Sequence, residues 1–222
     1  MDLREGRFVA TPEKGEVSYL LLRPPQAECC LVLGHGASSH YRHRTVESIA
    51  TALAHVGVAS FRYNFPYSEV GGGRNSNEVC IATIRSAVET SSQLVPKMSL
   101  IAAGHSFSGR MTSIGAAEHQ LDGIRGLVFY SFPLHPSGKP SIIRGDHLNR
   151  VIHPMLFLSG TRDALAEVQL LESVCATLGN RVHLHLVDTA DHSFKILKRS
   201  RQITDDPYNE MARVVQEWSH QL

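Results

Sequence analysis

Three side chains that could together carry out acyl transfer occur along the chain in the order serine, aspartate, histidine. Ser106 lies in the run GHSFSG, directly after the apolar run MSLIAA. Asp163 lies in SGTRD and His192 in DTADHSF, and each of these runs also follows an apolar segment. A serine becomes a nucleophile when a histidine accepts its proton and an acid orients that histidine. The residue types therefore predict a serine hydrolase if the fold brings the three together.

The serine run fits a sharp turn between a strand and a helix. The usual pattern is G-x-S-x-G, and here Ser108 stands in the fifth position. The context favours a nucleophile, because a buried strand precedes the run and a helix rich in small residues follows it. Those small residues, which would let the helix pack close to a sheet, are Gly109, Thr112, Ser113, Gly115 and Ala116. The alternative is a serine- and glycine-rich turn that binds a phosphate at the helix N-terminus.

Two backbone N–H groups are candidate donors for the oxyanion that forms during acyl transfer. Phe107 follows the expected nucleophile at the N-terminal end of the next helix, so its N–H can supply one donor. Ala37 lies in the run GHGASS after an earlier apolar segment and is the expected second donor. His35, in the same run, is expected to hold this loop in place rather than to take part in catalysis.

Two other aspartates, Asp188 and Asp191, compete with Asp163 for the role of the acid. A residue adjacent to His192 rarely folds back onto its Nδ1, so we favour Asp163. The other two are expected to cap helices or form turns.

Two basic residues are weaker candidates for binding substrate. Arg110 follows the serine run and Lys139 lies in a loop at the end of a strand, so either could receive an anionic group. Pairing at the surface or within the structure is the favoured interpretation of both.

Two pairs of histidines could bind a metal ion. His183 and His185 would share one face of a strand, and His40 and His43 lie in a loop. Neither pair has an acidic third ligand at a suggestive spacing, so solvated histidines are favoured. We expect neither a metal ion nor a cofactor.

Strands that alternate with helices must position these residues. The expected strands are Glu16–Arg23, Cys29–Leu33, Val58–Phe61, Met98–Ala103, Gly126–Ser131, His153–Ser159 and Arg181–Val187. The expected helices are Thr45–Val56, Asn77–Leu94, Gly109 to about His119, Ala166–Leu178 and Asp206–His220. This alternation predicts an α/β fold in which a mostly parallel sheet is covered by helices on both faces. Ligands bind at the carboxyl ends of the strands in such sheets.

Length and composition set the class of protein. The 222 residues predict a single domain, and 42% hydrophobic with 19% charged residues is typical of a soluble globular chain. A net charge of +1 argues against nucleic acid as a partner. No apolar run is long enough for a membrane span and the N-terminus lacks an apolar core, so we expect a cytoplasmic protein. The four cysteines show no C-x-x-C spacing and predict neither disulfides nor zinc.

The runs GHGASS, FRYNFPY, GHSFSGR, SFPLHPSGKP, SGTRD and DHSF resemble, in this order, the lidless dienelactone-hydrolase-like branch of the α/β-hydrolase superfamily. The resemblance extends from about Leu31 to the C-terminus. It implies an α/β-hydrolase fold without a large lid, with Ser106 as nucleophile, Asp163 as acid and His192 as base. The sequence departs from the family pattern at Ser108 (usually Gly), His105 (Lys) and Ser137 (Pro).

The residues and the resemblance together predict a serine hydrolase whose partner is a small or medium ester or thioester. Some relatives serve in protein complexes, so the alternative is an interaction subunit of hydrolase fold with little or no turnover. The irregular segment Phe132–Arg150 is too short to form a separate cap domain.

Overall fold

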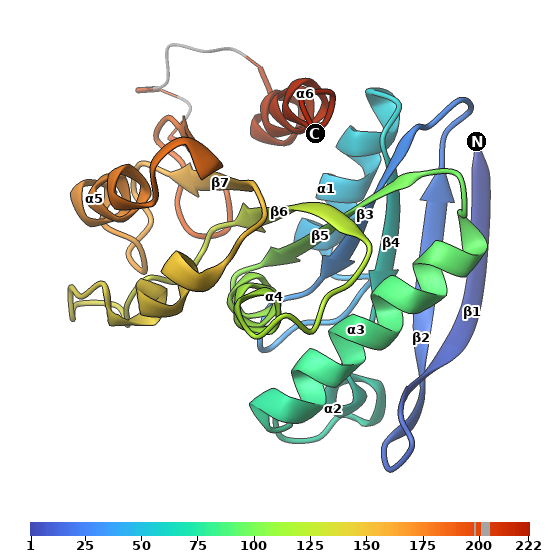
Figure 1. The fold of residues 1–222 in the computed structure, drawn as a ribbon. Helices are drawn as coiled ribbons and strands as arrows, with labels where there is room; N and C mark the ends of the chain where they lie inside the picture. The colour runs from blue at the N-terminus through green and yellow to red at the C-terminus, as the bar shows by residue number, and fades with distance from the viewer. Residues whose placement is uncertain (198, 201–204) are drawn as a thin grey trace.

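The computed structural model describes residues 1–197, 199–200 and 205–222, and in this part of the chain eight strands form one sheet (Figure 1). Their order in the sheet is β1-β2-β4-β3-β5-β6-β7-β8. The strands are β1 (Asp2–Thr11), β2 (Gly15–Arg23), β3 (Cys29–Gly34), β4 (Ala59–Tyr63), β5 (Ser99–His105), β6 (Ile124–Tyr130), β7 (Met155–Gly160) and β8 (Val182–Val187). Strand β2 pairs antiparallel with β1 and β4, and the other neighbours are parallel.

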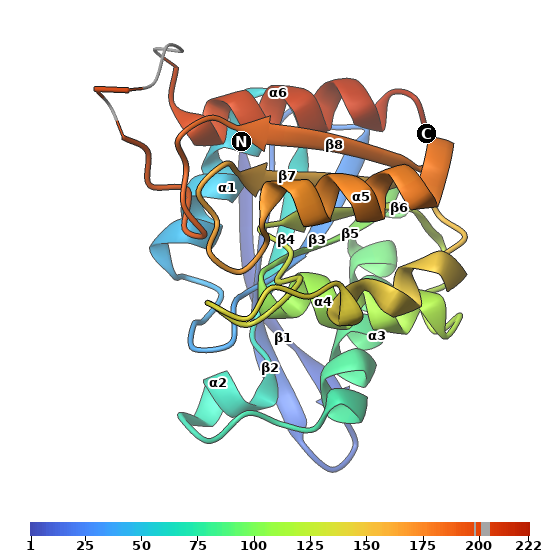
Figure 2. The ribbon, with the colours of Figure 1, turned by 90° about the vertical axis from the view of Figure 1, so that its left-hand side faces the viewer.

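Helices cover both faces of this sheet. The α-helices of the described residues are α1 (Arg44–His55), α2 (Pro66–Val70), α3 (Asn77–Leu94), α4 (Phe107–Ala117), α5 (Val168–Leu178) and α6 (Pro207–Ser219). Two 3₁₀-helices, η1 (Ile143–Arg150) and η2 (Gly179–Arg181), join them. Figures 1 and 2 show α1 and α6 on one side of the sheet and α3 and α4 on the other. The fold class predicted from the sequence is therefore confirmed.

The core lies in two layers, one on each face of the sheet. Along β3, Cys30 and Val32 pack into the layer under α3, α4 and α5, whereas Leu31 and Leu33 pack into the layer under α1 and α6. All four side chains are buried. Both faces of the strand are covered, which explains why its sequence is continuously apolar rather than alternating.

Three elements differ from the sequence expectation. Strand β1 was not predicted, because it is an edge strand with many charged residues and with Leu3 and Val9 exposed, so no alternation shows. Helix α2 was not among the expected helices; it has one turn, begins at Pro66 and is capped after Val70 by Gly71, whose φ is 73°. The segment expected to be irregular contains η1, in which few residues are buried, so no helical period marks it.

The parallel strands direct their carboxyl ends to one edge of the sheet. The loops after β3, β5, β7 and β8 carry the residues that the sequence analysis selected for catalysis. No helix among the described residues combines the length and apolar character that crossing a bilayer requires.

Candidate active site

Ser106 occupies the turn between β5 and α4 in a strained backbone conformation. Its φ of 54° and ψ of −113° are rare for a residue with a side chain, and such strain concentrates at functional sites. Its N–H donates to the carbonyl oxygen of Tyr130 at 2.8 Å, which ties the turn to β6. Helix α4 begins at Phe107, two residues earlier than predicted, because the helix starts directly after the serine.

The turn requires glycine where strand and helix meet. A Cβ atom built on Gly104 would lie 2.3 Å from the backbone nitrogen of Gly109, and one built on Gly109 would lie 2.9 Å from the carbonyl oxygen of Gly104. Real Cβ atoms do not approach backbone atoms so closely. The two glycines therefore let the chain reverse tightly and expose Ser106.

Ser108, which stands where the usual pattern has glycine, is fully buried in the same turn. Its Oγ donates to the carbonyl oxygen of His105 at 3.1 Å. A Cβ built on Gly34 would lie 2.6 Å from the Ser108 Cβ, so the space around this side chain is already full. The hydroxyl fits because it is small and has a local acceptor.

We expect Ser108→Gly to keep most of the activity against esters and Ser108→Val to lose both activity and stability. Glycine removes one hydrogen bond, whereas valine adds bulk to a filled space, at a cost of about 1–3 kcal/mol in the free energy of unfolding. Thermal melts and ester kinetics on both variants measure these effects. Equal tolerance of valine and glycine would contradict the tight turn at Ser106.

Of the three residues expected to act together, His192 lies within hydrogen-bond distance of both Ser106 and Asp163. The Nε2 atom of His192 lies 2.8 Å from the Oγ of Ser106. Its Nδ1 lies 2.9 and 2.8 Å from the two carboxylate oxygens of Asp163. The Asp163 side chain is completely buried, whereas that of His192 is 23% exposed.

Hydrogen bonds between the two loops hold Asp163 beside His192. Arg162 donates its N–H to the carbonyl oxygen of Ala190 at 2.9 Å, and the N–H of Thr189 donates to the Thr161 hydroxyl at 2.8 Å. A Cβ on Gly160 would lie 2.2 Å from the Ala190 carbonyl oxygen, so only glycine allows this approach. The loops after β7 and β8 therefore form one unit.

The rival acid Asp191 is engaged in a turn. Its Oδ1 accepts from the backbone N–H groups of Ser193 and Lys195 at 2.8 and 3.0 Å, as expected for a turn-forming aspartate. It is Asp163 whose carboxylate meets His192. Asp188 makes an interaction of its own and stays a predicted turn residue.

Phe107 directly follows Ser106, and Ala37 lies in the loop after β3, the strand next to β5 in the sheet. In the part of the chain that the structure describes, neither N–H donates to a protein acceptor. Phe107 is the first residue of α4, where N–H groups are unpaired and the helix dipole favours negative charge. Both groups are therefore free to donate to an oxyanion.

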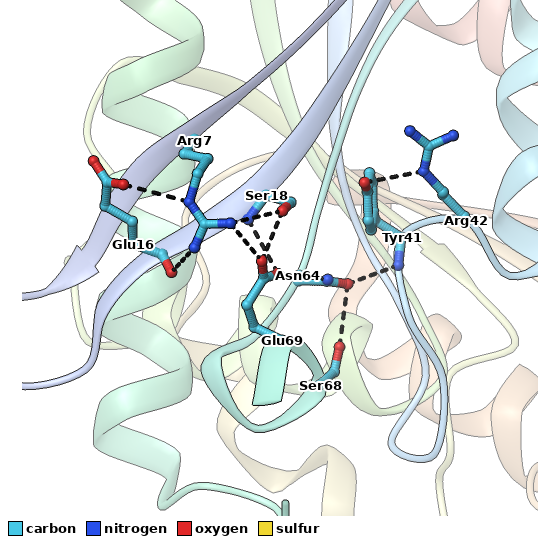
Figure 3. A network of polar contacts seen from close by, with 8 residues as sticks. All are labelled: Arg7, Glu16, Ser18, Tyr41, Arg42, Asn64, Ser68 and Glu69. Carbon is cyan, nitrogen blue, oxygen red and sulfur yellow. Dashed lines mark hydrogen bonds and ion pairs between the residues drawn. The ribbon is translucent and has the colours of Figure 1, made fainter. Parts of the chain in front are cut away.

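His35 and Asn64 hold the loop that carries Ala37. His35 is buried, which lowers its pKa to about 4, and its Nε2 accepts from the N–H of Phe65 at 3.3 Å. Asn64, directly after β4, accepts from the N–H of Tyr41 at 2.9 Å (Figure 3). Ser68 Oγ lies 3.1 Å from both Asn64 Oδ1 and His35 Nε2. The role expected of His35 matches these contacts.

Glu69 connects this network to the N-terminal strands, as Figure 3 shows. Its carboxylate accepts from Asn64 Nδ2 and Ser18 Oγ, both at 2.7 Å, and from Arg7 Nη1 at 2.9 Å. Desolvation opposes its ionisation, but the hydrogen bonds together hold the pKa of Glu69 below its usual value. Sequence reasoning missed Asn64 and Glu69, although Asn64 lies within the quoted run FRYNFPY, directly after a strand.

His105, the residue before Ser106, lies beside His192. Its Nε2 is 3.3 Å from the carbonyl oxygen of His192, and the two ring centroids are 5.8 Å apart. Burial and the neighbouring His192 lower the pKa of His105 to about 4, so the ring is neutral at pH 7. A neutral ring can donate one hydrogen bond to His192 and support its backbone.

The structure places the two weaker substrate-binding candidates differently. Arg110 is half-buried in the first turn of α4, and no acidic partner stands beside it among the described residues, contrary to the pairing that we favoured. Lys139 is exposed in the loop after β6, and only its backbone makes a hydrogen bond in the described chain.

The histidine pairs make other contacts. His185 Nε2 lies 2.8 Å from Glu210 Oε1, so this histidine is paired rather than simply solvated. His43 caps α1 by accepting from the N–H of Thr45, and His40 accepts from the N–H of Arg42. The described residues hold no group of three or more side chains suited to a metal ion.

Residues 27–220 match the model of a family described as the alpha/beta hydrolase domain. The chain therefore belongs to the α/β-hydrolase family. This confirms the superfamily that the sequence motifs predicted.

Solved structures of similar fold cover almost the whole chain. Dienelactone hydrolase from Anabaena variabilis has a TM-score of 0.76 at 16% identity, covering 100% of this chain and 99% of that one. A serine hydrolase without a lid from Xanthomonas campestris has a TM-score of 0.72 at 17% identity, covering 98% and 94%. The esterase domain of a Rhodothermus marinus protein has a TM-score of 0.74 at 15% identity, covering 100% and 99%. At such low sequence identities, the similarity to these structures shows that the chain shares their fold.

Proposed function

We propose that this chain is a serine hydrolase that cleaves a small or medium carboxylic ester or thioester through an acyl-enzyme. The observation that carries the proposal is the continuous hydrogen-bonded relay from Ser106 through His192 to the buried Asp163. Similarity to a dienelactone hydrolase and to an esterase domain supports the same class of reaction.

In the proposed mechanism, His192 Nε2 takes the hydroxyl proton of Ser106 as its Oγ attacks the carbonyl carbon. Asp163 holds the Nδ1–H of His192 and stabilises the imidazolium. The N–H groups of Phe107 and Ala37 donate to the resulting oxyanion. Collapse breaks the bond to the leaving alcohol or thiol, which takes the proton from His192. Water, activated by the same histidine, then releases the acid and regenerates Ser106.

The alternative of an interaction subunit with little turnover is less well supported. A subunit kept only for binding would not need a nucleophile in strained conformation, a base in contact with it and two free donors beside it. The two hypotheses predict different reactivity towards mechanism-based reagents.

Labelling with a fluorophosphonate probe distinguishes the serine hydrolase from the interaction subunit. We expect one adduct per chain by intact mass, mapped to Ser106 by peptide sequencing, and formed more slowly while an excess of an ester substrate is present. A folded protein that takes up no probe would favour the interaction subunit. Esters of graded acyl length, assayed on the same preparation, then define the length of acyl chain that the site accepts.

A further inference from the structure

Arg62, on β4, is buried in the sheet without a carboxylate partner. It is 3% exposed and belongs to no ion pair of the described residues. Its buried Nε has no hydrogen-bond partner in that part of the chain. Burial holds the pKa of Arg62 below its ordinary value, yet an arginine remains charged at pH 7. A charge held in this way lowers the stability of the fold, because its lost hydration is not fully replaced.

The hydrogen bond that Arg62 does make fixes the loop after β3. Arg62 pairs in register with Leu33 of β3, whose side chain packs under α1 and α6, so both side chains lie on that face of the sheet. Its Nη1 donates to the carbonyl oxygen of Tyr41 at 3.3 Å. The N–H of Tyr41 donates to Asn64 Oδ1 at 2.9 Å (Figure 3). Two residues at the carboxyl end of β4 therefore hold both backbone polar groups of Tyr41.

Ala37, whose N–H we assign to the oxyanion, lies between Tyr41 and a second held point. The carbonyl oxygen of Gly36 accepts from the Tyr67 hydroxyl at 3.4 Å and lies 2.8 Å from His35 Nδ1. Three residues separate Ala37 from Tyr41, so a shift of Tyr41 passes directly to the donor. A misplacement of about 1 Å in a catalytic group can lower a rate by about 10²-fold. The hold on Tyr41 therefore bears on the rate.

We propose that Arg62 is a positioning residue for the oxyanion donor: it holds Tyr41 so that the Ala37 N–H stays where the oxyanion forms. The inference rests on the proposed function, because an oxyanion forms only if Ser106 attacks a carbonyl carbon. Arg62 acts through the loop and touches no reacting atom. A residue kept for this purpose contributes to activity while its buried charge lowers stability. Its replacement should therefore change the two properties in opposite directions.

Arg62→Met tests this role, because methionine keeps an unbranched stem and removes the charge and the donor. We expect kcat for p-nitrophenyl acetate to fall by about 10²-fold, the lower end of the loss seen when an oxyanion donor is removed, with KM unchanged. The melting temperature should stay the same or rise, since an apolar side chain in place of a buried charge is often neutral or stabilising. Steady-state kinetics and thermal melts measure the two effects.

Leu53→Ala is the matched control, with the opposite pair of effects. Leu53 is fully buried on the same face of the sheet, in the last turn of α1, and α1 begins directly after the loop. Its truncation should lower the melting temperature through the cavity that it leaves, while kcat stays within a fewfold of the original value. A loss of kcat that simply followed the melting temperature in both variants would overturn the positioning role of Arg62.

An aryl trifluoromethyl ketone reports on the oxyanion itself. In the proposed mechanism Ser106 Oγ bonds to its carbonyl carbon, the π pair moves onto the carbonyl oxygen, and the hydroxyl proton passes to His192. The adduct keeps its oxyanion because it has no leaving group to expel. In Arg62→Met the inhibition constant should rise by the same factor by which kcat/KM falls. Arg62→Lys keeps the charge but ends one bond short of the Tyr41 carbonyl oxygen, so it should lose less of both.

Amide hydrogen exchange separates this inference from the proposed function, because it needs no turnover. Faster exchange confined to residues 36–41 of Arg62→Met, in a protein that turns over no ester, would support the hold on the loop and defeat the hydrolase. Ester turnover with kcat, inhibition constant and loop exchange all unchanged in Arg62→Met would overturn the positioning role and leave the hydrolase intact. Should Arg62→Met not fold, Arg62→Lys should show smaller changes in the same directions, and unchanged values there would overturn the role.

Discussion

Replacing Ser106 by alanine should abolish the hydrolysis of p-nitrophenyl acetate. The hydroxyl is the atom that attacks the carbonyl carbon in the proposed mechanism, and its Oγ contacts His192 Nε2 at 2.8 Å. Removal of a triad serine lowers kcat by about 10⁶-fold in a well-studied case, and we expect a loss of that order here. Spectrophotometric assay at 405 nm, scaled to enzyme concentration, measures it.

The fold should survive this change, because alanine differs from serine only by the hydroxyl. Thermal melts should agree within a few degrees between the two proteins. The control is Ser92→Ala, an exposed serine on α3, which should keep full activity. Undiminished hydrolysis by the Ser106→Ala protein would exclude Ser106 as the nucleophile.

Asp163→Asn should lower the rate by about 10⁴-fold, the loss observed when a triad histidine is held in the wrong tautomer. The carboxylate accepts from His192 Nδ1, and its Oδ1 also accepts from the N–H of Leu165 at 2.8 Å. An amide that turns its NH₂ towards Nδ1 would favour the tautomer with the proton on Nε2, which cannot accept from Ser106. Ester kinetics and the pH profile of kcat/KM measure the effect.

Asp191→Asn is the matched control in the same pair of loops. Asp191 Oδ1 accepts from two backbone N–H groups, and an asparagine oxygen can accept both of these bonds. We therefore expect a far smaller loss of rate, with the turn around His192 preserved. A larger loss for Asp191→Asn than for Asp163→Asn would reverse our assignment of the acid.

The sequence predicts the central elements well because burial leaves a clear pattern there. Strands β3 and β5 are covered on both faces, so they are continuously apolar and bounded by glycine. At the edge of the sheet, burial leaves no such pattern in the sequence. Half of β1 faces solvent and is charged, and its place is set by pairing with β2 rather than by its own apolar residues.

The same contrast applies to the site. Ser106, Asp163 and His192 could be selected because each follows a buried strand, and the structure brings them together as expected; their catalytic roles stay a prediction. Glu69 could not be selected, because its partners Ser18 and Arg7 lie 51 and 62 residues away in the sequence. A contact made only in the folded chain leaves no local pattern.

The position of His192 after the last strand of the sheet has a consequence for how the protein loses function. Strand β8 pairs only with β7 among the described residues, and most of it is partly exposed. Such a border element opens locally at a lower free-energy cost than the centre of the sheet. Its fraying would draw His192 away from Ser106 while β3, β4 and β5 stay intact. Heating should therefore inactivate the protein reversibly before its circular dichroism signal melts.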